Sequence, residues 1–171
     1  NESHKTASGI EYAVDDPNNA KWVNPLGSFI LNCNAIRYLS VYWIIRLTGT
    51  QPQEIPRIAF TDLVEQIQRF ISESRVSEQL RDECLAAWRQ ALDLDELREM
   101  LAGCTTQPDG LLPVDSWERG AGPLIGDVKK IVEMNDKAVE VAKTLGRLLD
   151  SVLAILATTI ETPPESPRAA E

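Results

Sequence analysis

The segment DVKKIVEMNDKAVEVAKTLGRLLDSVLAIL, residues 127–156, decides the fold class. From Ile131 onward its apolar positions recur with alternating steps of four and three residues. This is the a/d spacing of helices that pack at about 20° to their neighbours. One polar residue, Asn135, interrupts the seam at an a-like position, where a buried amide typically fixes helix register or selects a partner. The spacing therefore predicts one long helix over residues 127–160.

Three earlier stretches carry the same helical period, at residues 25–48, 58–75 and 77–103. Residues suited to helix ends flank them: Pro25 and Gly49 for the first helix, Thr61 and Ser77 as N-caps of the next two. Strand patterns are nearly absent, and the linker between the second and third helices is short, which favours an antiparallel hairpin. We therefore expect an all-α fold, a four-helix antiparallel bundle with Trp43 and Trp88 in its core.

A length of 171 residues favours one domain. Residues 1–20 show no sustained period and are expected to be a flexible N-terminal segment, which leaves 21–160 for the helical bundle domain. Residues 104–126 form a long Gly/Pro-rich loop before the last helix, with one short strand expected at 111–114. The Pro/Glu-rich residues 161–171 are expected to be a disordered tail.

The charge balance disfavours nucleic acid as a partner. The chain has 26 acidic and 17 basic residues, a net charge of −9, and phosphate backbones repel such a protein. The most apolar stretch carries Asn32, Asn34 and Arg37 at its middle, so we expect a core helix and no membrane span. Three widely spaced cysteines without a CxxC motif indicate buried free thiols in a reducing, cytoplasmic compartment.

The number and position of the residues suited to catalysis exclude most catalytic arrangements. The single histidine, His4, lies in the segment expected to be flexible, so a Ser/His or Cys/His pair is not expected. No glycine-rich phosphate-binding motif occurs. The acidic residues between Asp93 and Glu99, and between Glu133 and Glu140, are interpreted as solvated helix faces. The sequence therefore predicts no catalytic residue, no metal site and no cofactor.

Aromatic and apolar positions predict association with another chain. Tyr38 and Tyr42 add aromatic surface of the kind enriched in interfaces. Arg37 and Asn135 are polar breaks in apolar seams; we expect structural roles for them, with Arg37 either reaching the surface or pairing with a carboxylate, and partner recognition is the alternative. The C-terminal half of the last helix is expected to stay exposed in a monomer, through residues that include Leu149, Val152 and Leu156. These positions predict a symmetric homodimer or a stable complex with another protein. The alternative is that the first helix shields this half within one chain.

The stretch LDELREMLAGC, residues 94–104, resembles the L-x-x-x-R-N-x-x-A-H-G segment that ends a core helix in the HEPN superfamily. Those proteins are small helical bundles, and many are ribonucleases of toxin–antitoxin and phage-defence systems. Arg98 matches the motif arginine and Ala102 the alanine, whereas Gly103 stands where the family has its histidine, and Glu99 replaces the usual polar neighbour. The first helix is also similar, with Arg37 at a position that is often acidic, and the resemblance spans roughly residues 20–160.

The resemblance implies a catalytically silent member, because the family histidine takes part directly in RNA cleavage. The first hypothesis is therefore a non-catalytic helical protein-interaction module of a toxin–antitoxin or defence-type system. The alternative is an RNA-binding or RNA-cleaving enzyme that uses Arg98, with Glu99 nearby, without the usual histidine. A third hypothesis is an accessory or ligand-pocket domain of a larger protein.

Overall fold

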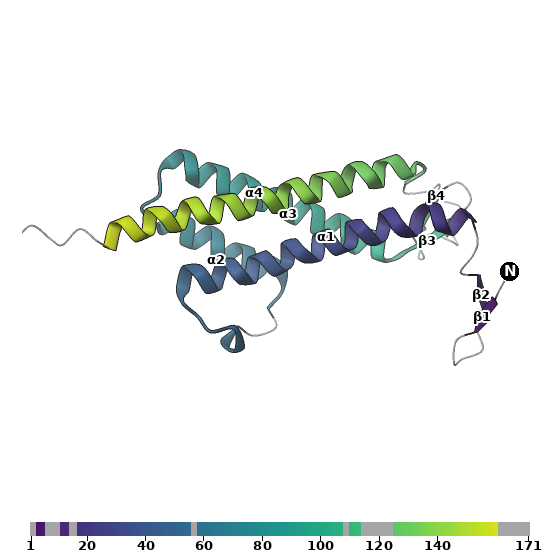
Figure 1. Cartoon of the computed structure of the whole chain (residues 1–171), viewed down its shortest axis with the longest axis horizontal. Coiled ribbons are helices and arrows are strands. Elements are labelled where there is room, and N and C mark those ends of the chain that lie inside the picture. The colour runs from purple at the N-terminus through teal and green to yellow at the C-terminus, as the bar shows by residue number, and fades with distance from the viewer. Residues whose placement is uncertain are drawn as a thin grey trace, which may run out of the picture. The chain divides into compact units, whose positions relative to one another are not determined.

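The computed structural model describes residues 3–5, 11–13, 17–55, 58–107, 110–113 and 125–160. Within these ranges it contains four α-helices: α1 (Pro17–Thr48), α2 (Phe60–Glu73), α3 (Glu78–Ala102) and α4 (Val128–Ile160) (Figure 1). A short 3-10 helix, η1 (Pro52–Glu54), lies between α1 and α2. The predicted all-α, four-helix bundle is confirmed. None of the helices in the described part of the chain combines the length and apolarity that crossing a bilayer requires.

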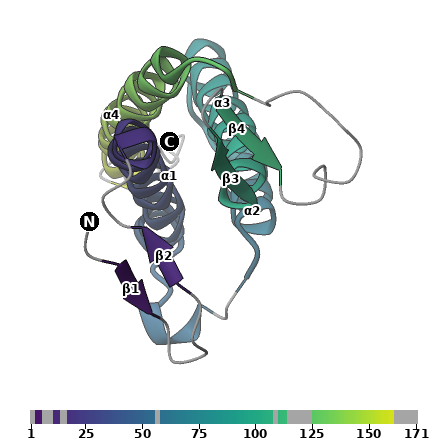
Figure 2. The ribbon, with the colours of Figure 1, turned by 90° about the vertical axis from the view of Figure 1, so that its right-hand side faces the viewer.

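Two short hairpins accompany the helices. Strand β1 (Ser3–Lys5) pairs antiparallel with β2 (Glu11–Ala13), and β3 (Cys104–Gln107) pairs with β4 (Gly110–Pro113); Figure 2 shows each pair side by side. The segment expected to be flexible thus contains β1 and β2. The strand expected at 111–114 begins one residue earlier and forms a hairpin with β3. The predicted tail 161–171 lies outside the described residues.

Local capping explains several helix ends. At the start of α4 the Asp127 carboxylate accepts a hydrogen bond from the Lys129 N–H at 2.9 Å, and at the start of α3 Ser77 Oγ accepts one from the Leu80 N–H at 3.2 Å. Gly49 follows α1 with φ +73° and donates its N–H to the Ile45 carbonyl at 2.9 Å, as a C′ glycine does. These three boundary predictions are confirmed.

Two helix starts differ from the prediction. The N-cap of α2 is Ala59, without a side-chain hydrogen bond, and Thr61 already lies inside the helix. Phe60, the first residue of α2, is buried, so the first turn of the helix already contributes to the core. Helix α1 begins at Pro17, so Pro25 lies in its interior instead of its first turn. Burial of Trp22 stabilises these additional turns despite the hydrogen bond that Pro25 removes.

The chain divides into two compact units, each with a core of its own. Unit 1 comprises Asn1–Arg37 and Gln90–Ala142, and unit 2 comprises Tyr38–Arg89 and Lys143–Glu171. The buried apolar residues of unit 1 are Trp22, Phe29, Cys33, Ile36, Ala91, Leu94, Leu101, Leu111, Ile125, Ile131, Ala138 and Val141. Those of unit 2 are Trp43, Ile44, Phe60, Leu63, Val64, Ile67, Ile71, Val76, Cys84, Ala87, Trp88, Leu145, Leu148, Leu149 and Val152.

Aromatic packing dominates the core of unit 2. The rings of Trp43 and Trp88 meet edge to face with centroids 5.4 Å apart, and Phe60 lies 6.4 Å from Trp88. Such geometry is favoured by the ring quadrupoles and adds roughly 0.5–1.5 kcal/mol per pair beyond the apolar area that is buried. Both tryptophans are completely buried, which confirms the prediction for these two positions.

The prediction for the C-terminal half of the last helix is wrong. Leu149 and Val152 are buried within the single chain, together with Leu145 and Leu148. Leu156, near the end of α4, is half-buried. These four residues are therefore covered within the single chain, and they are removed from the candidate interface residues.

Candidate functional site

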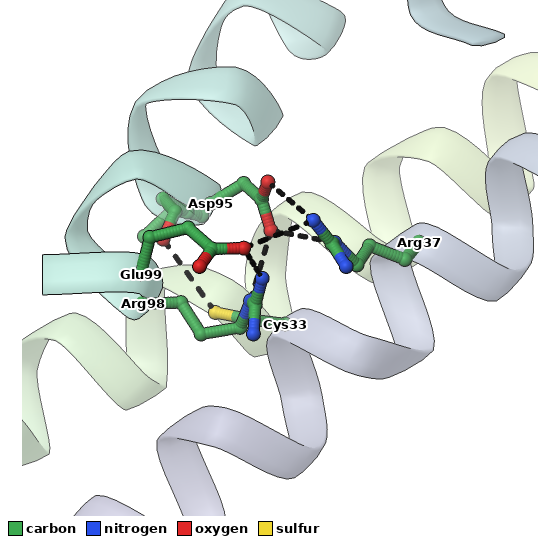
Figure 3. A network of polar contacts seen from close by, with 6 residues as sticks. Cys33, Arg37, Asp95, Arg98 and Glu99 are labelled. Atoms are coloured by element: carbon green, nitrogen blue, oxygen red, sulfur yellow. Dashed lines mark hydrogen bonds and ion pairs between the residues drawn. The ribbon is translucent and has the colours of Figure 1, made fainter. Parts of the chain in front are cut away.

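The most elaborate polar site lies in unit 1 and is called here the arginine–carboxylate cluster: Arg37, Asp95, Arg98 and Glu99 (Figure 3). Helix α1 supplies Arg37, one turn after Cys33, and α3 supplies the other three residues. Residues three and four apart lie on the same helix face, so the sequence D-x-x-R-E turns Asp95, Arg98 and Glu99 to one side of α3. The cluster therefore joins two helices that are far apart in sequence.

Asp95 is the centre of the cluster. Its Oδ1 accepts hydrogen bonds from Arg37 Nε at 2.8 Å and from Arg98 Nε at 2.9 Å, and its Oδ2 accepts one from Arg37 Nη2 at 3.1 Å. The residue is only 8% exposed, and a carboxylate at that depth is stable only when it is paired and hydrogen-bonded. The interpretation of the acidic residues of α3 as a solvated face is therefore wrong for Asp95.

Glu99 closes the cluster on its outer side. It is exposed, and its Oε1 accepts hydrogen bonds from Arg37 Nη2 at 3.2 Å and from Arg98 Nη2. Two guanidinium groups thus meet two carboxylates, so the formal charge of the cluster is zero. An exposed ion pair contributes about 0–1 kcal/mol, so Asp95 carries most of the electrostatic stabilisation.

Arg98 donates its hydrogen bonds inside the protein. Its side chain is 12% exposed, and its Nε and Nη2 donate to the two carboxylates. Burial alone would lower the pKa of Arg98, but the hydrogen bonds and charges of Asp95 and Glu99 outweigh it and hold that pKa above its ordinary value. A guanidinium neutralised in this way attracts a phosphate less than an uncompensated one does.

Cys33 lies beside the cluster and is not an activated nucleophile. Burial, followed by the charge of Asp95, raises the pKa of its thiol to about 11, and its Sγ lies 3.8 Å from the Leu94 carbonyl. Burial likewise raises the pKa of Cys84 to about 11 and raises the pKa of Cys104. Since the thiolate is the reactive form, none of the three thiols is poised for catalysis at neutral pH.

Asn135 has a partner in its own chain. In unit 1, Asn32 Nδ2 on α1 donates to Asn135 Oδ1 on α4 at 2.7 Å, in a partly buried position. A pair of amides across two helices has one favourable alignment, because a shift by one residue would leave both without a partner. The structure thus gives this interface candidate a register-fixing contact inside the bundle.

The tyrosine candidates are presented outward. Tyr38 is 71% exposed and Tyr42 is 39% exposed, both on α1 in unit 2. The structure adds a residue that sequence reasoning missed: Arg46 Nη1 donates to the Tyr42 hydroxyl at 2.9 Å, and its guanidinium carbon lies 5.7 Å from the Tyr42 ring centroid. The spacing Tyr-x-x-x-Arg was the available signal for this pair.

The described residues bring no metal-binding set of side chains together. The described His, Cys, Asp and Glu side chains hold no group of three that could bind a metal ion. The single histidine, His4, lies in β1 opposite Tyr12 and away in sequence from Arg98. Comparisons with protein-family models, curated proteins and solved structures gave no match to this chain.

Proposed function

We propose that this chain is a non-catalytic helical protein-interaction module that docks a partner on the outer face of α1. The observation that carries the proposal is the exposure of Tyr38 and Tyr42, at 71% and 39%. Tyrosine offers a large contact area at small entropic cost and is enriched in interface cores and among the residues that dominate binding energy. Packing of the bundle core does not account for these two tyrosines, because both are exposed to solvent.

The composition of α1 supports the same proposal. Between Pro17 and Thr48 the helix has no aspartate or glutamate, although the whole chain has a net charge of −9. Depletion of carboxylates, with tyrosine and arginine retained, is the pattern of the buried centre of an interface. Apolar exposure also occurs on α1 within unit 1, at Val23 and Leu31.

The HEPN resemblance supports a silent module more than an enzyme. The motif arginine, Arg98, donates to Asp95 and Glu99, and Gly103 follows α3 where the family has its histidine. General acid–base catalysis typically raises a reaction rate about 10²–10⁴-fold. The single histidine that could provide it, His4, is far from Arg98 in sequence. We expect the purified protein to leave RNA intact without metal. RNA cleavage that is lost in a folded Arg98→Ala variant would favour the enzyme alternative instead.

A selection experiment tests the proposal. A displayed library of helical peptides is selected against the full chain, and binders are measured against a double variant, Tyr38→Ala with Tyr42→Ala. Exposed substitutions usually change stability by less than about 0.5 kcal/mol, so the variant should fold normally by circular dichroism. We expect it to lose the binders, whereas Val132→Ala, at an exposed apolar position on α4, should keep them. Binders that all tolerate the tyrosine substitutions would contradict the proposal.

A further inference from the structure

The orientation of one cation points to the chemistry of the partner, on the assumption that the proposed docking surface is correct. We propose that the partner presents an acidic helix whose carboxylate binds Arg46 while its apolar side covers Tyr38 and Tyr42. These three residues are called here the tyrosine–arginine strip. They follow one another at intervals of four on α1, all within unit 2, so they share one helix face.

The described contacts of the Arg46 guanidinium go to an aromatic residue. Its hydrogen bond at 2.9 Å and its cation–π contact at 5.7 Å both go to Tyr42, and it pairs with no acidic side chain among the described residues. The other arginines with described ion pairs contrast with it: Arg37 and Arg98 are neutralised in unit 1, and Arg69 binds Glu73 on α2 at 3.0 Å. Arg46 therefore retains donors for a carboxylate from outside.

Tyr42 prepares Arg46 for that role. Its hydroxyl accepts a hydrogen bond from the guanidinium and its ring lies within cation–π distance, and a guanidinium that is already positioned loses less side-chain entropy when it binds. A planar guanidinium with free donors matches a carboxylate in a bidentate arrangement better than an ammonium does. The favoured partner group is thus an aspartate or glutamate next to an apolar patch.

A second copy of the strip fits poorly as the occupant. Two strips facing each other would bring together two Arg46 cations from helices that contain no carboxylate. A nucleic acid fits poorly as well, because it presents phosphates along its whole length to a protein of net charge −9, whereas the proposed partner needs one carboxylate at Arg46 beside apolar side chains. An acidic helix with an apolar side complements both the positive charge of Arg46 and the apolar area of the tyrosines.

Charge reversal on the full chain tests the inference. The same displayed helical library, with apolar and charged positions both varied, is selected in parallel against wild type, Arg46→Glu and Arg69→Glu. Arg69 is the matched control, since it is an exposed arginine on α2 in the same unit. We expect aspartate and glutamate to be enriched against wild type and Arg69→Glu, and lysine and arginine against Arg46→Glu. Acidic binders should bind Arg46→Glu at least about tenfold more weakly, because a charge-assisted hydrogen bond is lost.

The outcomes separate this inference from the proposed function. Binders that need the tyrosines but show no acidic preference, and bind Arg46→Glu equally well, would overturn the acidic partner and leave the docking surface standing. Binders that ignore both the tyrosines and Arg46 would overturn the two together. Sedimentation that shows a dimer at micromolar concentration, dissociated by Tyr38→Glu, would assign the strip to a second copy and also overturn the acidic partner.

Discussion

The two compact units are stabilised by different chemistry. Unit 2 is built around Trp43, Trp88 and Phe60, which pack edge to face and tilted in a largely apolar core that also buries Ser40. Unit 1 instead places the buried carboxylate of Asp95 between two arginines and pairs two asparagines across α1 and α4. Apolar burial is non-directional and tolerates small shifts, whereas these polar contacts hold only in one alignment. The core of unit 2 thus stabilises the fold through buried apolar area. The polar contacts of unit 1 also fix the register of the helices that they join.

The largest expected effect is in the aromatic core. Trp88→Ala removes a completely buried ring and its contacts with Trp43 and Phe60, so it should lower the free energy of unfolding by about 3–5 kcal/mol. Denaturant melts followed by circular dichroism measure this change. Trp88→Phe is the control and should cost much less, because it retains a ring and removes an indole N–H that lacks a described acceptor. A loss below about 1 kcal/mol in Trp88→Ala would contradict this picture of unit 2.

The next effect lies in the arginine–carboxylate cluster. Asp95→Ala leaves Arg37 and Arg98 without their shared acceptor. Breaking a buried ion pair costs about 3–5 kcal/mol, and we expect about 2–3 here, since the Arg37 side chain is 39% exposed. Glu99→Gln, at the exposed side of the cluster, should cost less than about 1 kcal/mol. Equal losses in the two variants would show that Asp95 is not the centre of the cluster.

The buried thiols predict a loss of stability in alkali. Burial raises the pKa of Cys33 and of Cys84 from 9.0 to about 11 in the folded protein. Above pH 9 the unfolded chain releases these protons and the folded chain keeps them, so the free energy of unfolding falls as pH rises from 9 toward 11. The loss should reach about 1 kcal/mol for each thiol by pH 10. Melts of a Cys33→Ala, Cys84→Ala variant should show a flatter dependence, and an identical slope would contradict the prediction.

The asparagine pair gives the smallest of these effects. Asn32→Ala and Asn135→Ala should each cost about 1 kcal/mol, because each leaves one partly buried amide without its partner. The double variant should cost less than the sum of the two, since the second substitution removes a group that is already unpaired. Strict additivity in the denaturant melts of this double-mutant cycle would show that the two amides do not interact.

The apolar features of both units could be predicted from the sequence, and the polar site only in part. The periods around Trp43 and Trp88 gave the helices and the buried rings, because burial follows from spacing along one helix. Asp95 was interpreted as a surface residue, since its partner Arg37 is 58 residues away and only the packing of α1 on α3 brings them together. Leu149 and Val152 were placed at an interface for a related reason: a seam shows which face is apolar, and only the tertiary fold shows what covers it.

The exposed tyrosines of α1, and not the cluster around Arg98, form the proposed docking surface. Hydrogen–deuterium exchange of the full chain with the strongest binder from the peptide selection tests it most directly. We predict slower exchange of the backbone amides of residues 38–46, where the tyrosine–arginine strip lies, with residues 90–102 unchanged. Slower exchange at residues 90–102 of α3, with none at 38–46, would contradict the claim and move the binding site to Arg98.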